Sequence, residues 1–259
     1  MSEQHNWKEA AAALNELLRL HSTPIGVKVL PTKEELAAVP KLRTPTTQLN
    51  PCQIMAQAIQ KGFTIAATAE YVSNLNCCSI HGFREISQEF LDGAFFNGVW
   101  FANAQAACAH QTSLHTLPQN PQGGIVYSPL RSARIEPDVC VLLVNPAQAF
   151  ILFSGLIEGD YKKLDFEFVG ESSCSAGWIR TLVTGKPSLT PPCYAELRFG
   201  GFPEGELIAA LTPAQLATAI QGMMRLASVG LRYPAPSYAA DNDPIAGLAA
   251  SYDPKTLGR

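Results

Sequence analysis

The chain has 259 residues, of which 47% are hydrophobic and 16% charged, and its formal net charge is −3. This length can bury a full core, and the slightly acidic balance without a Lys or Arg cluster argues against nucleic-acid binding. No apolar run approaches the roughly 20 residues that span a bilayer, so we expect no membrane partner. The small charged fraction favours a homo-oligomer that buries part of its surface.

The first residues show no basic segment followed by an apolar one, so we expect no signal peptide and a cytoplasmic location. Thiols stay reduced in that compartment. Seven cysteines there favour metal binding, catalysis or core packing over a disulfide framework.

Periodicity and turn residues predict the elements of the first half of the chain. Thr32 is expected to cap a short helix, and Pro51 to open a longer one. The predicted order is helix 6–20, strand 25–30, helix 33–38, helix 51–61, strand 63–69, a turn-rich loop 71–82, helices 85–91 and 103–114, and strand 124–127.

In the second half, the strongest strand signal is the β-branched, apolar segment 137–144, which we expect to be a central strand. The further predictions are helix 146–156, strand 164–169, helix 175–183, a Pro-rich loop 185–192, strand 196–199, and helices 203–211 and 213–229. Residues 234–259 are rich in Pro, Ala, Asp and Ser and are predicted to form an extended arm.

This succession predicts an α/β fold, with α+β as the alternative, in which a mixed sheet packs with helices. We expect residues 1–233 to form one compact domain. It is divisible into duplicated halves at 21–130 and 131–233.

The division into halves rests on two matching frames of cysteine and glycine. Each frame follows a strand candidate and has one cysteine before a helix-like run and a second after an extended run. The frames are Cys52, Gly62, Cys78 and Gly82, and then Cys174, Gly185, Cys193 and Gly200. A duplication of this kind brings four thiolates together, and four converging thiolates bind an iron–sulfur cluster or zinc.

Core packing is the alternative interpretation of any single cysteine, because Cys is among the most buried residue types. It is the favoured one for Cys140 within its apolar strand and for Cys108 within an Ala-rich helix. Cys77 and Cys78 are adjacent, and adjacent side chains diverge. We therefore expect only one of the two to bind the metal, and we predict that it is Cys78. Cys52, at a helix N-terminus, is expected to have a lowered thiol pKa.

The chain contains no Walker A motif, nucleophile elbow, dinucleotide fingerprint or His-Glu-x-x-His zinc motif. The segment from Cys78 to His81 fits neither a zinc finger nor covalent haem attachment. His81 is a candidate ligand, proton donor or structural histidine. Arg84, Arg180 and Arg198 follow the cysteines at short range and are candidates to neutralise a cluster or to bind an anionic substrate.

Several of these residues occur in an order that resembles domain-of-unknown-function family 169. The series is Ser22 to Lys28, Cys52, Cys78 with Gly82, Pro137, Pro146 to Gln148, Cys174, Cys193 with Arg198, and Thr212-Pro213. The resemblance covers about residues 14–234. It implies that Cys52, Cys78, Cys174 and Cys193 are family-type cysteines and suggests that they carry an iron–sulfur cluster, but it supplies no reaction.

The first hypothesis is a [4Fe–4S] protein in which Cys52, Cys78, Cys174 and Cys193 bind the cluster. It would act in redox or Lewis-acid chemistry, as an oxidoreductase or a lyase, with a small-molecule substrate or a redox partner protein. His81, Arg198 and Lys28 are the candidate catalytic or supporting residues. The alternatives are a structural zinc or metal-free small-molecule-binding module and, as a third, an enzyme with Cys78 as nucleophile beside His81.

Overall fold

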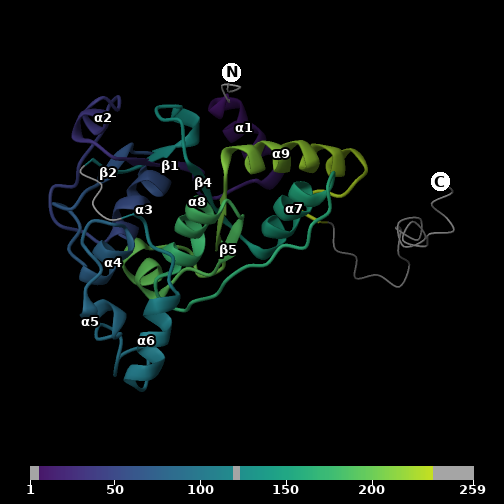
Figure 1. The fold of residues 1–259 in the computed structure, drawn as a ribbon. Helices are drawn as coiled ribbons and strands as arrows, with labels where there is room; N and C mark the ends of the chain where they lie inside the picture. Colours follow the sequence, from purple (N-terminus) through teal and green to yellow (C-terminus); the bar gives the residue numbers. More distant parts are fainter. Residues whose placement is uncertain (1–5, 119–122, 236–259) are drawn as a thin grey trace.

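The computed structural model describes residues 6–118 and 123–235, which fold around one six-stranded sheet (Figure 1). The strands are β1 (Ile25–Leu30), β2 (Ile65–Ala67), β3 (Gly124–Pro129), β4 (Val139–Val144), β5 (Ser188–Thr190) and β6 (Leu207–Leu211). The helices are α1 (Trp7–Leu18), α2 (Lys33–Ala37), α3 (Pro51–Lys61), α4 (Leu75–Ile80), α5 (Gln88–Leu91), α6 (Ala104–Ser113), α7 (Pro146–Ile157), α8 (Arg180–Thr184) and α9 (Pro213–Ser228). Shorter helical turns are η1 (Leu130–Ser132), η2 (Ser175–Ile179) and η3 (Glu196–Gly200).

The sheet has the order β2-β3-β1-β4-β6-β5. The predicted combination of helices and a sheet is confirmed, but every pairing among these strands is antiparallel, so the predicted mixed sheet is wrong and the α+β alternative describes the fold better. In the first half of the chain β1 lies at the centre of the sheet, β3 lies beside it and β2 lies at the edge. In the second half β4, β6 and β5 take the corresponding positions. This order is what a duplication would produce, and the division into two halves stays a prediction.

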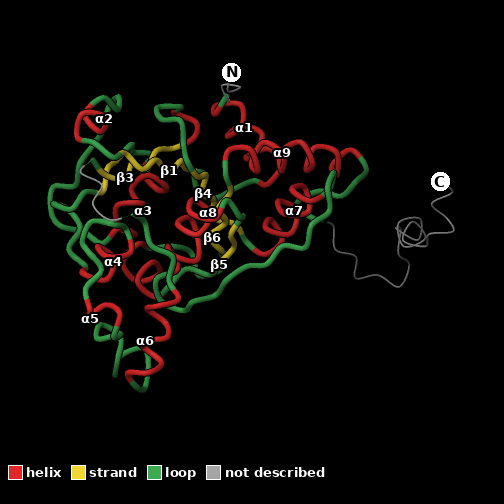
Figure 2. The backbone as a smooth tube through the Cα atoms, in the orientation of Figure 1, coloured by secondary structure: helices red, strands yellow, loops and turns green. Residues whose placement is uncertain are grey.

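Side chains alternate along β4 between two hydrophobic cores, as expected for a strand covered on both faces. Val141 packs in the core that includes residues of α3, α4 and η2, whereas Cys140 packs in the core that includes residues of α1, α7 and α9. Figure 2 shows the strands running through the middle of the molecule between these groups of helices. The central position of β4 and the core position of Cys140 are therefore confirmed.

Three helices begin in the same way, with Pro in the first turn and Gln as the third residue. In α7, Asn145 and Gln148 form a reciprocal capping box, and in α9 Thr212 and Gln215 do the same. In α3, Oε1 of Gln53 accepts from the backbone N–H of Asn50 at 2.9 Å. Because α3 begins at Pro51, Cys52 lies in its first turn.

Five predicted elements are wrong. The predicted loop 185–192 contains the strand β5. Segment 203–211 contains β6 instead of a helix, because its short apolar run pairs with β4 and β5, and that pairing overrides the helix propensity of Ala. Segment 164–169 alternates like a strand but has no strand partner in the described part of the chain. Segment 196–199 belongs to η3, and the loop 71–82 contains α4, which Asn74 caps.

Figure 1 shows α5 and α6 extending below the sheet, away from α1 and α9. None of the described helices is long and apolar enough to cross a membrane. Of the predicted arm 234–259, residues 236–259 lie outside the described part of the chain.

Candidate functional site

A cavity of about 340 Å³ lies on the α3 and α4 side of the sheet, and four of the seven cysteines line it. Cys52 comes from the first turn of α3, Cys77 from α4, Cys174 from the residue before η2, and Cys193 from the segment that leads into η3. Together with Glu171 and Glu196 these cysteines define what we call the cysteine pocket. The exposed residues Asn74 and Leu75 also line it, so the pocket opens to solvent.

Cys77, and not the predicted Cys78, lies on the pocket wall. The Cys78 thiol instead donates to the carbonyl oxygen of Val72 at 3.3 Å, and its side chain packs in the core. The reason is that the segment forms a helix, in which neighbouring side chains point about 100° apart. Asn74, Cys77 and His81 line the pocket, whereas Cys78 packs in the core.

The thiol pKa values of all four pocket cysteines are raised. Burial is the main cause at each one, and for Cys52 it brings the pKa to about 12 although the helix N-terminal amides act in the opposite direction. The lowered pKa expected for Cys52 is therefore wrong. Cys77 and Cys174 are partly accessible through the pocket, yet the surrounding protein desolvates them, and the neighbouring pocket thiols raise their pKa further. Without a bound cation these groups are neutral thiols at pH 7.

Glu196 is a buried carboxyl group that shapes the loop carrying Cys193. Its Oε2 accepts from the Cys193 backbone N–H at 2.9 Å and, through a short contact, from the Ser173 hydroxyl. Burial raises the pKa of Glu196 from 4.5 to about 7, and these hydrogen bonds only partly offset the rise. The same interactions join the Cys174 turn to the Cys193 loop, because Ser173 immediately precedes Cys174.

Glu171 and Asn76 tie the remaining walls of the pocket together. Oε2 of Glu171 accepts from the backbone N–H of Tyr194 at 3.2 Å. Nδ2 of Asn76 donates to the Ser172 hydroxyl at 3.0 Å, and its Oδ1 accepts from Gln111 at 2.7 Å. Thus α4 and α6 are both anchored to the turn that presents Cys174.

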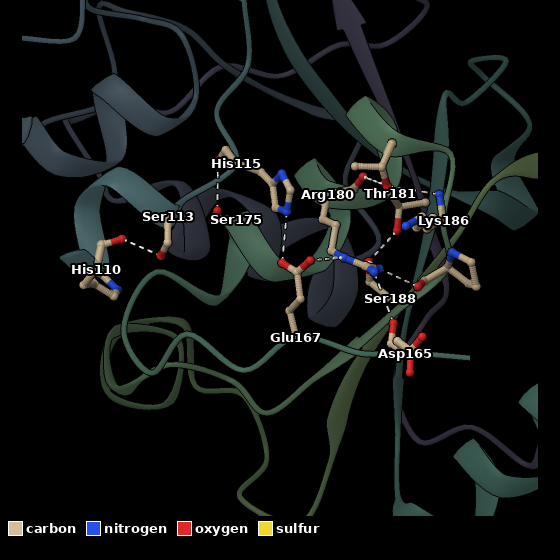
Figure 3. Close-up of polar contacts among 12 residues, drawn as sticks. His110, Ser113, His115, Asp165, Glu167, Ser175, Arg180, Thr181, Lys186 and Ser188 are labelled. Carbon is tan, nitrogen blue, oxygen red and sulfur yellow. Dashed lines mark hydrogen bonds and ion pairs between the residues drawn. The ribbon is translucent and has the colours of Figure 1, made fainter. Parts of the chain in front are cut away.

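Figure 3 shows a second anchor of this turn, centred on Glu167. The Glu167 carboxylate lies 2.9 Å from Nε2 of His115 and 2.8 Å from Nε of Arg180. Arg180 also donates to the carbonyl oxygen of Asp165 at 3.1 Å, and the Ser175 hydroxyl donates to the carbonyl oxygen of His115 at 2.9 Å. The network holds the extended connection after α7 against α8, and it accounts for the buried Arg180 outside the pocket.

His81 is the one predicted catalytic residue that lines the pocket. Its Nδ1 lies 2.8 Å from the carbonyl oxygen of Cys77, and its ring packs against Phe83 and Trp178. Burial lowers the pKa of His81 to about 4, so the ring is neutral at pH 7.

Lys28 and Arg198 do not line the pocket. Lys28 forms an ion pair with Asp138 at 2.6 Å, and Arg198 is exposed on η3, as Arg84 is on the loop after α4. No Lys or Arg occurs among the described residues that line the cysteine pocket. The site therefore has two carboxyl groups and four thiols but no side-chain cation, which makes it unsuited to an anionic substrate.

The four thiols around the cavity are ligands of the soft type that zinc and iron–sulfur clusters take. A tetrahedral zinc site with Zn–S bonds of about 2.3 Å holds its sulfur atoms about 3.8 Å apart. No three His, Cys, Asp or Glu side chains in the described ranges form a set that could hold one metal ion. A [4Fe–4S] cluster would take one thiolate on each iron, and Cys52, Cys77, Cys174 and Cys193 are the residues that would supply them.

The sequence prediction missed Cys77, Glu171, Glu196, Tyr127 and Trp178, which all line the pocket. A helical interpretation of 75–80 would not have chosen between Cys77 and Cys78, because both have helical spacing to His81. Glu196 stands three residues after Cys193, which is the spacing of a helix-capping acid. Nothing local marks Tyr127 or Trp178, because pairing of β3 and packing of η2 bring them to the site.

No curated protein and no solved structure matches the chain. The model of domain-of-unknown-function family 169, which is described as uncharacterised ArCR, matches residues 13–222. This match confirms the resemblance and includes all four pocket cysteines. The chain belongs to domain-of-unknown-function family 169.

Proposed function

We propose that the protein binds one [4Fe–4S] cluster through Cys52, Cys77, Cys174 and Cys193. The observation that carries the proposal is that these four cysteines, from four separate segments, line one cavity. Cys77 replaces Cys78 in the predicted ligand set.

The electrostatics of the pocket support a cationic inorganic occupant. Buried thiols ionise only when a positive charge compensates, and the described residues of the pocket wall supply no Lys or Arg. Ferrous and ferric ions provide that charge, and thiolate is the ligand type they take in iron–sulfur clusters. Glu171 and Glu196 are carboxyl groups on the same wall and supply no positive charge, so an anionic organic ligand is disfavoured.

Bound there, a cluster would supply one-electron transfer, or Lewis-acid chemistry at an iron without a protein ligand. The chain's own residues would enclose it: Glu196 and Ser173 hold the Cys193 loop, and Asn76 holds the Cys174 turn. The solvent opening beside Leu75 would admit a small molecule or face a redox partner protein. The proposed activity is that of an oxidoreductase or a lyase. We propose that the protein is a cytoplasmic homo-oligomer and that it has no nucleic-acid or membrane partner.

A metal-free small-molecule pocket is the second candidate. The cavity volume lies within the range of small-molecule sites, and Phe95, Phe96 and Trp178 give it aromatic walls. A cysteine nucleophile is less favoured, because burial raises the pKa of the Cys78 thiol and its Sγ donates to Val72.

The test is the content of iron, acid-labile sulfide and zinc per chain after strictly anaerobic purification and reconstitution. We expect about four irons and four sulfides in the wild type. Single Cys52→Ala, Cys174→Ala and Cys193→Ala replacements should lower both contents, and Cys140→Ala, in the other core, should not.

Each alternative gives a different result. One zinc without iron would move the assignment to a structural zinc site. Neither metal in the folded wild type would contradict the cluster and leave the small-molecule pocket. Full occupancy in one of the three pocket variants would show that its cysteine is not a ligand and would favour the open-iron enzyme.

A further inference from the structure

Two buried aromatic residues with polar hydrogen atoms line the cysteine pocket. Tyr127 lies on β3 and Trp178 on η2, and each side chain is only 1% exposed. Their rings meet edge to face with centroids 6.4 Å apart. Sheet and helix thus bring both groups to the same wall of the pocket.

The indole N–H of Trp178 has no hydrogen-bond partner among the described residues. A buried donor left without an acceptor costs about 1–3 kcal/mol, and folded proteins keep few of them. The ring of His81, whose centroid lies 5.6 Å from that of Trp178, donates through Nδ1–H to the carbonyl oxygen of Cys77 at 2.8 Å. An acceptor supplied by a bound group would satisfy this N–H.

Tyr127 lines the same pocket as the four thiols. Burial raises its pKa far above the ordinary value, and the next contributions come from Cys174, Cys52 and Cys77. Its O–H can donate to an acceptor in the pocket.

We propose that the Trp178 Nε1–H and the Tyr127 Oη–H are hydrogen-bond donors to the sulfur atoms of the group bound in the cysteine pocket. This inference rests on the proposed cluster and makes both residues positioning residues that also adjust its reduction potential. Hydrogen bonds to cluster sulfurs are one of the means by which a protein sets that potential. The donors stabilise the more negative, reduced state, so their removal should lower the potential.

The test compares anaerobically reconstituted wild type with Tyr127→Phe and Trp178→Phe. Each replacement removes one polar hydrogen and keeps an aromatic ring. Trp7→Phe and Tyr161→Phe are the matched controls, because Trp7 is a buried indole that already donates to Glu136 at 2.8 Å, and Tyr161 is 77% exposed. Iron per chain, circular dichroism and the midpoint potential from a dye-mediated redox titration are measured for all five proteins.

We expect the pocket variants to fold and bind iron, with midpoint potentials below the wild-type value by more than the spread of the two controls. We also expect them to lose iron to a chelator severalfold faster than the controls. Potentials and iron-loss rates equal to those of the controls would overturn the donor role while leaving the cluster intact. A wild type that binds no iron would overturn the proposed function itself, and the donor role with it. Tyr127→Phe keeps the test decisive if Trp178→Phe fails to fold, since it removes only one oxygen atom.

Discussion

Replacing Glu196 with Gln should change how the stability of the metal-free protein depends on pH. Burial raises the pKa of this carboxyl group from 4.5 to about 7. Between these values the folded chain keeps a proton that the unfolded chain has released. The carboxyl group's contribution to stability is therefore complete below pH 4.5 and is lost as the pH rises through 7.

The size of the effect follows from the difference between the two pKa values. At about 1.4 kcal/mol for each pKa unit, the wild type should lose about 3 kcal/mol between pH 4.5 and pH 8 through this group alone. The amide that Glu196→Gln introduces cannot titrate, and its carbonyl oxygen can still accept from the backbone N–H of Cys193. The variant should therefore lack this part of the pH dependence.

The assay is urea unfolding of the reduced, metal-free wild type and of Glu196→Gln at pH 5 and pH 8. Other titrating groups, including His81 and the cysteines, act in both proteins and cancel in the comparison. We expect the wild type to lose about 2.5 kcal/mol more than the variant on going from pH 5 to pH 8. Parallel losses in the two proteins would refute the assignment of a raised pKa to Glu196.

Two further predictions concern packing and thiol chemistry. A Cβ atom at Gly222 would lie 1.9 Å from the Gly155 carbonyl oxygen, so Gly222→Ala should lower the free energy of unfolding by about 3 kcal/mol. Gly205 has open space around it, so Gly205→Ala is the control and should not lower the free energy of unfolding. Equal urea midpoints for the two variants would contradict the close helix contact. At pH 8 the raised pKa of Cys52 should slow its alkylation by iodoacetamide roughly a thousandfold relative to the unfolded chain. Peptide mass spectrometry measures that ratio, and similar rates would show an accessible thiolate.

Sequence signals that act over a few residues were enough to predict some of the helices and one strand. The capped helices α2, α3, α7 and α9 and the apolar strand β4 could be assigned because caps, Pro positions and β-branched runs act over a few residues. The strand β6 could not, since Leu207–Leu211 is too short to separate strand from helix without its neighbours β4 and β5.

The site could be predicted only in part for the same reason. Cys52, Cys174 and Cys193 were found from their positions beside turns, and all three line the pocket. The choice between Cys77 and Cys78 depended on how α4 packs, because only tertiary contacts place Cys78 in the core and Cys77 in the pocket. The rest of the wall, including Glu196, is assembled by long-range packing that no local pattern records.

The central claim is that four cysteines of one pocket bind a cluster, and the pair Cys77 and Cys78 tests it most directly. The two residues are adjacent and chemically identical, but only Cys77 lines the cysteine pocket. Iron and acid-labile sulfide should be measured in anaerobically reconstituted Cys77→Ala and Cys78→Ala proteins beside the wild type. The account predicts that Cys77→Ala loses iron and sulfide while Cys78→Ala keeps the wild-type content of about four each. Loss in Cys78→Ala with full occupancy in Cys77→Ala would contradict it.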